Sequence, residues 1–107
     1  MSRLEITVED LHARLESSQS PLLLDVRRYD ERQEARIGGC LHIPLDELDE
    51  RLDELDPNAE YIVYCHHGIR SLSAAAMLEA AGFPNPKSLR GGIDAWSLRV
   101  APEVPRY

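Results

Sequence analysis

Short apolar runs alternate with amphipathic segments along this chain. Leu22–Val26 and Tyr61–Tyr64 are nearly continuous apolar runs, which are typical of strands buried on both faces of a parallel sheet. Two further segments, Cys40–Ile43 and Lys87–Leu89, are additional strand candidates. Helices are predicted at Val8–Glu16, Tyr29–Ala35, Leu45–Leu55, Ser71–Ala81 and Ile93–Leu98. Of these, Tyr29–Ala35 is polar and is expected to be exposed, whereas Ser71–Ala81 is apolar on most sides and is expected to be central. Strands that alternate with helices predict an α/β fold with a parallel sheet and helices on both of its faces.

One predicted helix has two very different sides. Its leucines at 45, 48, 52 and 55 recur at spacings that place them on a single stripe. Residues 46–60 also carry eight acidic residues and one basic residue, Arg51. We interpret the acidic side as a solvated helix face, and an acidic surface for docking a partner is the alternative.

Length and charge narrow the class of protein. The 107 residues are fewer than the roughly 150 of a typical domain, so we expect a single domain spanning residues 1–107. A net charge of −7 disfavours nucleic acid as a partner, because such a surface repels phosphates. The longest apolar runs have five residues, against about 20 needed to span a bilayer, so we expect no membrane segment. The N-terminus does not resemble a signal peptide, and we expect a cytoplasmic protein with free thiols.

One segment combines a thiol with a loop suited to hold an anion. Cys65 follows the predicted strand Tyr61–Tyr64, where ligands bind in parallel α/β sheets. The segment leads into the next predicted helix and consists of Cys65, His66, His67, Gly68, Ile69, Arg70 and Ser71. Inward-pointing backbone N–H groups and the positive end of a helix dipole favour a negative charge there. We therefore predict that Cys65 is a nucleophilic thiolate and that residues 66–71 form the substrate-binding loop.

The side chains of this loop have different expected roles. Gly68 allows a tight curl, and Arg70 can add positive charge for an anionic substrate, with pairing to an acidic residue as the alternative. Of His66 and His67, we expect one to face solvent and one to lie over the cleft, and their spacing does not say which.

Three residues outside the loop also carry polar or reactive groups. Asp25 and Arg27 lie two apart on a strand and therefore share a face, where we expect a polar pair that supports the loop. Cys40 is expected to pack as a small apolar side chain, and a resolving thiol is the alternative. The candidate metal ligands are Cys40, His42, Cys65, His66 and His67. Their spacing does not match that of a zinc site, so we predict no metal site.

The segment 65–71 resembles the active-site loop of the rhodanese-type sulfurtransferases. Three other segments are similar to motifs of that family and occur in the family's order, at residues 24–27, 36–44 and 89–96. The resemblance extends from about residue 4 to the C-terminus. It departs from the family pattern at Arg36, Gly38 and Cys40, where histidine, proline and alanine are usual.

This resemblance implies a rhodanese-like domain with a small, mostly parallel, five-stranded sheet. It also implies that Cys65 attacks the outer sulfur of thiosulfate or another donor, releases sulfite and carries the sulfur as a persulfide. A thiol or cyanide would then accept the sulfur, and no cofactor is needed. The expected partners are a small-molecule sulfur donor and a thiol acceptor, or a protein that carries a persulfide.

Two other functions are compatible with the same segment. Cysteine-dependent phosphatases and arsenate reductases place an arginine six residues after the cysteine, whereas here Ser71 occupies that position and Arg70 comes one residue earlier. A relay or docking module that passes sulfur only between proteins would have the same sequence signature. Turnover of free thiosulfate would distinguish a small-molecule enzyme from such a relay.

Overall fold

The computed structural model describes residues 3–18 and 20–107. Met1 and Ser2, where a signal peptide would begin, and Gln19 lie outside the described residues. The described strands are β1 (Glu5–Ile6), β2 (Leu22–Asp25), β3 (Leu41–His42), β4 (Tyr61–Tyr64) and β5 (Lys87–Leu89). They form one sheet in the order β1-β5-β4-β2-β3, and each neighbouring pair is parallel. The predicted α/β class and five-stranded sheet are therefore confirmed, and the described strands include no antiparallel pair.

The helices match the amphipathic segments with two corrections. They are α1 (Val8–Leu15), α2 (Tyr29–Glu34), α3 (Leu45–Leu48), the 3₁₀ helix η1 (Asp49–Glu54), α4 (Ile69–Ala80) and α5 (Gly92–Arg99). The single helix predicted over Leu45–Leu55 is wrong, because the backbone leaves helical geometry at Arg51 (φ −118°, ψ 16°). Helix α4 begins two residues earlier than predicted, directly after Gly68 (φ 98°).

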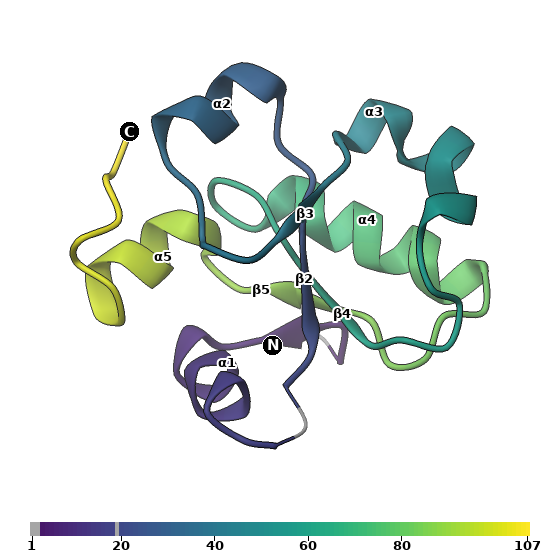
Figure 1. Ribbon diagram of the computed structural model, residues 1–107, viewed down its shortest axis with the longest axis horizontal. Coiled ribbons are helices and arrows are strands. Elements are labelled where there is room, and N and C mark those ends of the chain that lie inside the picture. The colour runs from purple at the N-terminus through teal and green to yellow at the C-terminus, as the bar shows by residue number, and fades with distance from the viewer. Residues whose placement is uncertain (1–2, 19) are drawn as a thin grey trace.

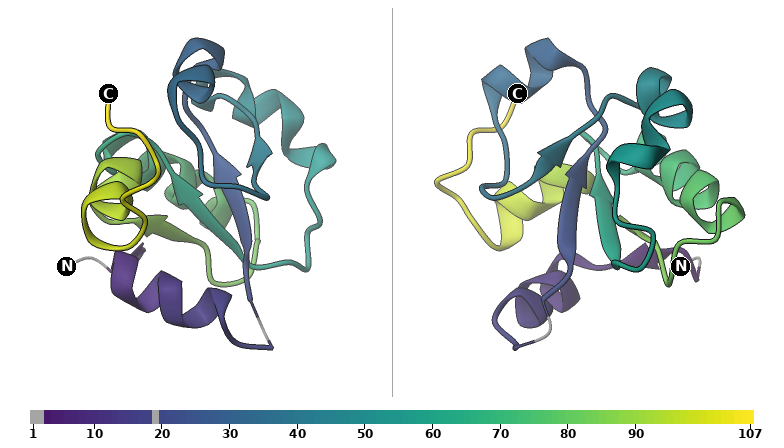
Figure 2. Two further views of the ribbon diagram at one scale, coloured as in Figure 1. Left: turned by 60° about the vertical axis from the view of Figure 1, so that its left-hand side comes forward. Right: turned by 45° about the vertical axis from the view of Figure 1, so that its right-hand side comes forward.

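Helices cover both faces of the sheet, as the strand sequences require (Figures 1 and 2). Side chains alternate along β4: Ile62 and Tyr64 belong to the core beneath α1 and α5, whereas Val63 and Cys65 belong to the core beneath α3 and α4. All of these side chains are buried, which explains why β4 is apolar at every position. None of the described helices is long and apolar enough to cross a membrane.

The carboxyl edge of the sheet gathers segments that are distant in sequence. The loop after β4 lies there, together with the turns that follow β2 and β5 and lead into α2 and α5. The C-terminal tail leaves α5 and returns toward α2 along this edge (Figure 1). The edge therefore brings together several parts of the chain that are distant in sequence.

Candidate active site

Cys65 is held at the carboxyl end of β4, with its thiol directed at the start of α4. The residue is only 1% exposed. Gly68 N and Ser71 N donate hydrogen bonds to Cys65 Sγ at 3.2 Å and 3.3 Å. The thiol also lies 3.4 Å from Ser71 Oγ, which it donates to while protonated and which can donate to sulfur once the thiol is ionised. Two amides and one hydroxyl thus surround a single sulfur atom.

The hydroxyl of Ser71 is itself hydrogen-bonded to a second buried hydroxyl, that of Ser88. Ser71 Oγ and Ser88 Oγ are 2.7 Å apart, and both serines are fully buried. Ser88 lies on β5, so this hydrogen bond ties the first turn of α4 to the neighbouring strand. The Ser71 hydroxyl is therefore held near the sulfur by a buried partner.

The first turn of α5 holds the backbone of the loop. Ile93 N donates to Cys65 O at 2.9 Å, and Asp94 N donates to His66 O at 3.2 Å. Gly92 comes just before them with φ 62°, and a Cβ atom at that position would lie 2.4 Å from both Cys65 O and His66 O. Glycine is needed here for its positive φ and for this close approach.

Replacing Gly92 with alanine is expected to lower the free energy of unfolding by about 2–3 kcal/mol, because the left-handed backbone and the Cβ contact both oppose it. The displaced carbonyls should also slow alkylation of Cys65 by iodoacetamide, which intact mass measures. Gly82→Ala is the matched control, since Gly82 also has a positive φ (89°) but no atom within 4 Å of the added Cβ. Equal losses of stability in the two variants would contradict the contact argument.

Arg70 is bound by a carboxylate of α2. Its Nη1 and Nη2 donate to Glu31 Oε1 at 2.6 Å and Glu31 Oε2 at 2.8 Å. The hydrogen bonds to Glu31 raise the pKa of Arg70, and the nearby charge of Cys65 contributes in the same direction. Arg70 thus lies near Cys65, as a rim residue should, but its guanidinium is engaged by an acidic partner.

Tyr107 joins the C-terminal tail to the same network. Its hydroxyl donates to Glu31 Oε2 at 2.9 Å and accepts from Arg27 Nη1 at 2.9 Å. Burial raises the pKa of Tyr107 to about 12, so the phenol keeps its proton near neutral pH. Its ring stacks on His66, with ring centroids 4.0 Å apart and planes 9° apart.

The two histidines of the loop have different surroundings. His66 is half-buried between Tyr107 and His67, and its Nε2 is buried without a hydrogen-bond partner among the described residues. Burial lowers the pKa of His66, and the charge of His67 lowers it further. The side chain of His67 is 60% exposed, and its Nε2 lies 3.9 Å from Asp94 Oδ2. His66 therefore packs against the C-terminal tail, and His67 is the more exposed of the two.

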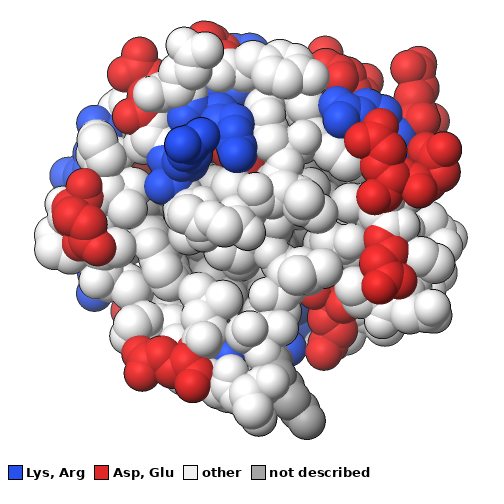
Figure 3. Space-filling model, in the orientation of Figure 1, with Lys and Arg blue, Asp and Glu red and all other residues white. Residues whose placement is uncertain are grey.

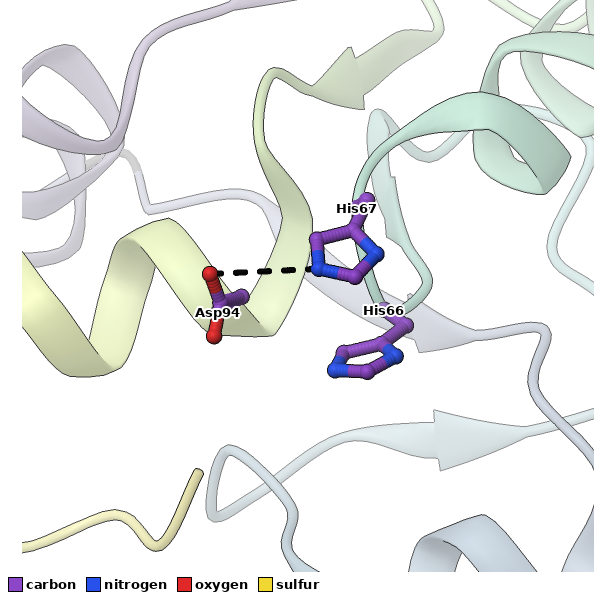
Figure 4. A group of neighbouring side chains, drawn as sticks. All are labelled: His66, His67 and Asp94. Carbon is purple, nitrogen blue, oxygen red and sulfur yellow. Dashed lines mark ion pairs between the residues drawn. The ribbon is translucent and has the colours of Figure 1, made fainter. Parts of the chain in front are cut away.

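Within the described part of the chain, His66, His67 and Asp94 form a group whose ligand atoms lie within 4.8 Å of one another (Figure 4). Their geometry does not suit a metal ion. Each imidazole directs its lone pair within its own ring plane, and the two rings are stacked with centroids 3.9 Å apart. Asp94 also accepts a hydrogen bond from Arg106 at 2.9 Å. We assign this group to the rim of the loop.

Asp25 and Arg27 form a fully buried ion pair. Arg27 Nη2 and Nε donate to the two carboxylate oxygens of Asp25 at 2.8 Å and 2.9 Å. Burial alone would lower the pKa of Arg27, but the hydrogen bonds to Asp25 and Tyr107 outweigh it and raise that pKa. Arg27 thereby connects β2 to the C-terminal tail.

Cys40 lies apart from Cys65. Its Sγ accepts from Arg32 Nη1 at 3.1 Å and lies 3.2 Å from the hydroxyl of Tyr64. Cys40 packs on the core beneath α1 and α5, whereas Cys65 belongs to the core on the opposite face of the sheet. This arrangement favours the packing role expected for Cys40 over a resolving thiol.

An open groove of about 390 Å³ lies next to the loop, between the starts of α2 and α3. It is mainly apolar and is lined by Val26, Arg28, Pro44, Leu45, Asp46 and Arg70. Ile69, which follows Gly68 in the loop, is 80% exposed. The loop therefore offers an accessible surface beside a well-buried thiol.

Sequence reasoning missed several residues of this site. Glu31, Ser88 and Tyr107 contact the loop or its arginine, yet each lies in a segment without a recognisable motif. Gly92 lies in the segment 89–96 that resembles a family motif, and its close contact with the loop backbone was not expected. Two adjacent glycines were the one signal that could have indicated this contact.

Comparison with known proteins identifies relatives along nearly the whole chain. Residues 7–99 match the family model of the rhodanese-like domain. A sulfurtransferase of Allochromatium vinosum is 35% identical over 94% of this chain and 94% of its own length. The thiosulfate sulfurtransferase GlpE of Coxiella burnetii is 37% identical over 70% of each chain. This chain spans only half of YrkF of Bacillus subtilis, which is named for sulfur carriage and is 37% identical over 87% of this chain.

Solved structures agree with this assignment. A rhodanese-related protein of Thermoplasma volcanium superposes with a TM-score of 0.83 and 31% identity, covering 96% of this chain and 98% of that one. A rhodanese-like domain protein of Staphylococcus aureus superposes with a TM-score of 0.80 and 27% identity, covering 96% and 97%. Because the matched region 7–99 contains the cysteine loop and the strands β2 to β5, the chain belongs to the rhodanese-like domain family, whose members named above support a role in sulfur transfer.

Proposed function

We propose that this protein transfers sulfane sulfur through a persulfide on Cys65. The observation that supports this best is the convergence of Gly68 N, Ser71 N and the Ser71 hydroxyl on one buried sulfur. Hydrogen-bond donors aimed at a fixed point stabilise a negative charge that forms there. The same donors can therefore serve the attacking thiolate and the anionic persulfide that replaces it.

In the first half-reaction the Cys65 thiolate attacks the outer sulfur of the donor. With thiosulfate, a new S–S bond forms to Cys65, the bond between the two thiosulfate sulfurs breaks, and sulfite leaves with that electron pair. With a persulfide R–S–SH, the leaving group is the thiolate R–S⁻. The backbone amides need not move during this step, which keeps the reorganisation cost low.

In the second half-reaction an acceptor thiol attacks the outer sulfur of the Cys65 persulfide. The acceptor becomes a persulfide, its proton stays with the products, and Cys65 returns to the thiolate. The groove beside Arg70 gives an acceptor a place to approach the loop. Because one covalent intermediate links the two halves, we expect ping-pong kinetics.

Intact mass after exposure to a sulfur donor tests the proposal. The protein is incubated with thiosulfate or with the freshly generated persulfide of N-acetylcysteine methyl ester, and the Cys40→Ser variant is treated in parallel. We expect a gain of one sulfur atom in both proteins, removed by dithiothreitol and located on Cys65 by peptide mapping. Cys40 is half-buried on the other face and serves as the internal control.

The alternatives give different results. Sulfur found on Cys40, or no gain with either donor or with a protein persulfide, would overturn the proposal. Loading only by a protein persulfide would indicate a relay between proteins. Hydrolysis of a phosphate ester in the absence of sulfur loading would indicate phosphatase chemistry.

A further inference from the structure

The charge of the loop's one basic residue is already balanced. Arg70 is the only lysine or arginine in residues 65–71. Both ends of its guanidinium bind the two oxygens of Glu31, in the two-bond geometry that is strongest for this pair. The side chain of Glu31 is 8% exposed and that of Arg70 is 32% exposed, so bulk water weakens this pair less than a surface one. An anion at Cys65 would therefore feel Arg70 together with the opposing charge of Glu31.

Glu31 is also held from two further directions. Arg28 N donates to Glu31 Oε1 at 3.1 Å, and the Tyr107 hydroxyl donates to Glu31 Oε2 at 2.9 Å. Its hydrogen bonds to Arg70 lower the pKa of Glu31 to about 2, so the carboxylate stays charged at any physiological pH. Swinging Glu31 away to free Arg70 would break bonds to three partners.

Other groups near the loop add little free positive charge. Basic side chains gather near α2 in the view of Figure 3, and acidic side chains lie to the left of and above them. Arg28 lines the groove beside Arg70, and its Nε donates to Asp30 at 3.1 Å. Burial lowers the pKa of His66, which favours its neutral form. The whole chain carries a net charge of −7.

We propose that Glu31 is a specificity-determining residue that disfavours free sulfur dianions as donors, so that Cys65 is loaded by persulfides of low charge. This inference rests on the proposed persulfide function and names the class of donor. The Arg70–Glu31 ion pair, in which Glu31 also accepts a hydrogen bond from Tyr107, is the structural element that discriminates between the two classes of donor.

The chemistry of the two donor classes makes this selection effective. Thiosulfate brings two negative charges to an anionic thiolate, and its leaving group, sulfite, also carries two. A persulfide with an uncharged body brings no charge in its protonated form and releases a thiolate with one. Like charges brought together in a partly buried site repel strongly, and a cation must compensate them. Because Arg70 is paired with Glu31, it compensates the negative charge of a donor only weakly. Loading of Cys65 by the dianion is therefore slowed far more than loading by the neutral persulfide.

The test compares loading rates of Cys65 for each donor, measured by quenched intact mass at fixed ionic strength. The probes are thiosulfate and the persulfide of N-acetylcysteine methyl ester. In Glu31→Gln, we expect the second-order rate constant for thiosulfate to rise about tenfold or more, because Arg70 gains a free charge. The rate constant for the persulfide should change less than about threefold, since its reaction needs no such cation.

Two control variants separate this effect from a general change in charge. Glu54 binds Arg51 through two hydrogen bonds of 2.8 Å and 2.9 Å on η1, so Glu54→Gln removes an equivalent charge outside the site. It should leave both rate constants within about twofold of wild type, because exposed charges are well screened. The double variant Glu31→Gln/Arg70→Ala restores the wild-type net charge of the pair, and the gain with thiosulfate should disappear.

Each other outcome has a defined meaning. A thiosulfate rate in Glu31→Gln no higher than in Glu54→Gln, or an equal rise for both donors, would overturn the inference while leaving persulfide loading intact. Failure of both donors and of a protein persulfide to load wild-type Cys65 would overturn the proposed function itself. If Glu31→Gln does not fold, Tyr107→Phe keeps the ring but removes one hydrogen bond to Glu31. It should raise the thiosulfate rate alone, by about twofold, and an unchanged rate would count against the inference.

Discussion

Replacing Cys65 with serine is expected to abolish sulfur transfer, with a loss of about a thousandfold or more in rate. Serine is close in size to cysteine and can accept the hydrogen bonds from Gly68 N and Ser71 N, so the loop should keep its shape. A hydroxyl is far less readily ionised than a thiol, and its oxygen cannot form the persulfide. The measurement is transfer of sulfur from the N-acetylcysteine methyl ester persulfide to cyanide, followed as thiocyanate.

The control for this variant is Cys40→Ser, which removes the other thiol of the chain. A serine at position 40 can still interact with Arg32 and Tyr64, so we expect activity within about twofold of wild type. Circular dichroism should show both variants folded. Retained transfer in Cys65→Ser, or a comparable loss in Cys40→Ser, would contradict the assignment of Cys65 as the catalytic residue.

Replacing Arg27 with methionine is expected to lower the free energy of unfolding by about 3–5 kcal/mol. The side chains of Arg27 and Asp25 are both 0% exposed, so removal of the guanidinium leaves a carboxylate buried without its counter-ion. The same change removes the hydrogen bonds of Arg27 to the backbone oxygens of Glu31 and Ala35 and to the Tyr107 hydroxyl. Urea unfolding at neutral pH measures the loss.

Arg51→Met is the matched control for this prediction. Arg51 also binds two carboxylates, Glu47 and Glu54, but its side chain is 30% exposed on η1. We expect a loss below about 1 kcal/mol, because solvent-exposed ion pairs contribute little. A double variant, Asp25→Leu/Arg27→Met, should recover part of the loss by removing both buried charges. Equal stability of Arg27→Met and Arg51→Met would contradict the argument from burial.

The order of elements could be predicted because its signals are local. The apolar run Tyr61–Tyr64 and the amphipathic segment around Leu11 follow the periods of a buried strand and a helix, and both elements form where expected. Strand β1 was missed because Glu5–Ile6 does not lie in an apolar run, and pairing with β5 defines it. The break at Arg51 was missed because the leucine stripe continues across it, with Leu48 and Leu55 both buried.

The residues of the candidate site also fall into those that local sequence could indicate and those that it could not. Cys65 and the loop through Ser71 are contiguous in sequence, so their motif shows directly. The partner of Arg70 was not identified in advance. An acidic residue was considered as its partner, but 19 acidic residues in the chain were candidates and only the packing of α2 against the loop selects Glu31.

The amino-acid sequence by itself determined the α/β class and the family and indicated Cys65 as the candidate nucleophile, because periodicity and contiguous motifs need no long-range information. Only the tertiary structure decided which groups pair with the charged side chains of the site and which segments cover it. Glu31 lies 39 residues from Arg70 and Tyr107 lies 80 residues from Arg27, so these bonds exist only once the sheet has brought α2 and the C-terminal tail to its carboxyl edge. The strength of a hydrogen bond or ion pair depends on the distance between its groups and on their burial, and for these residues only folding sets that distance and that burial.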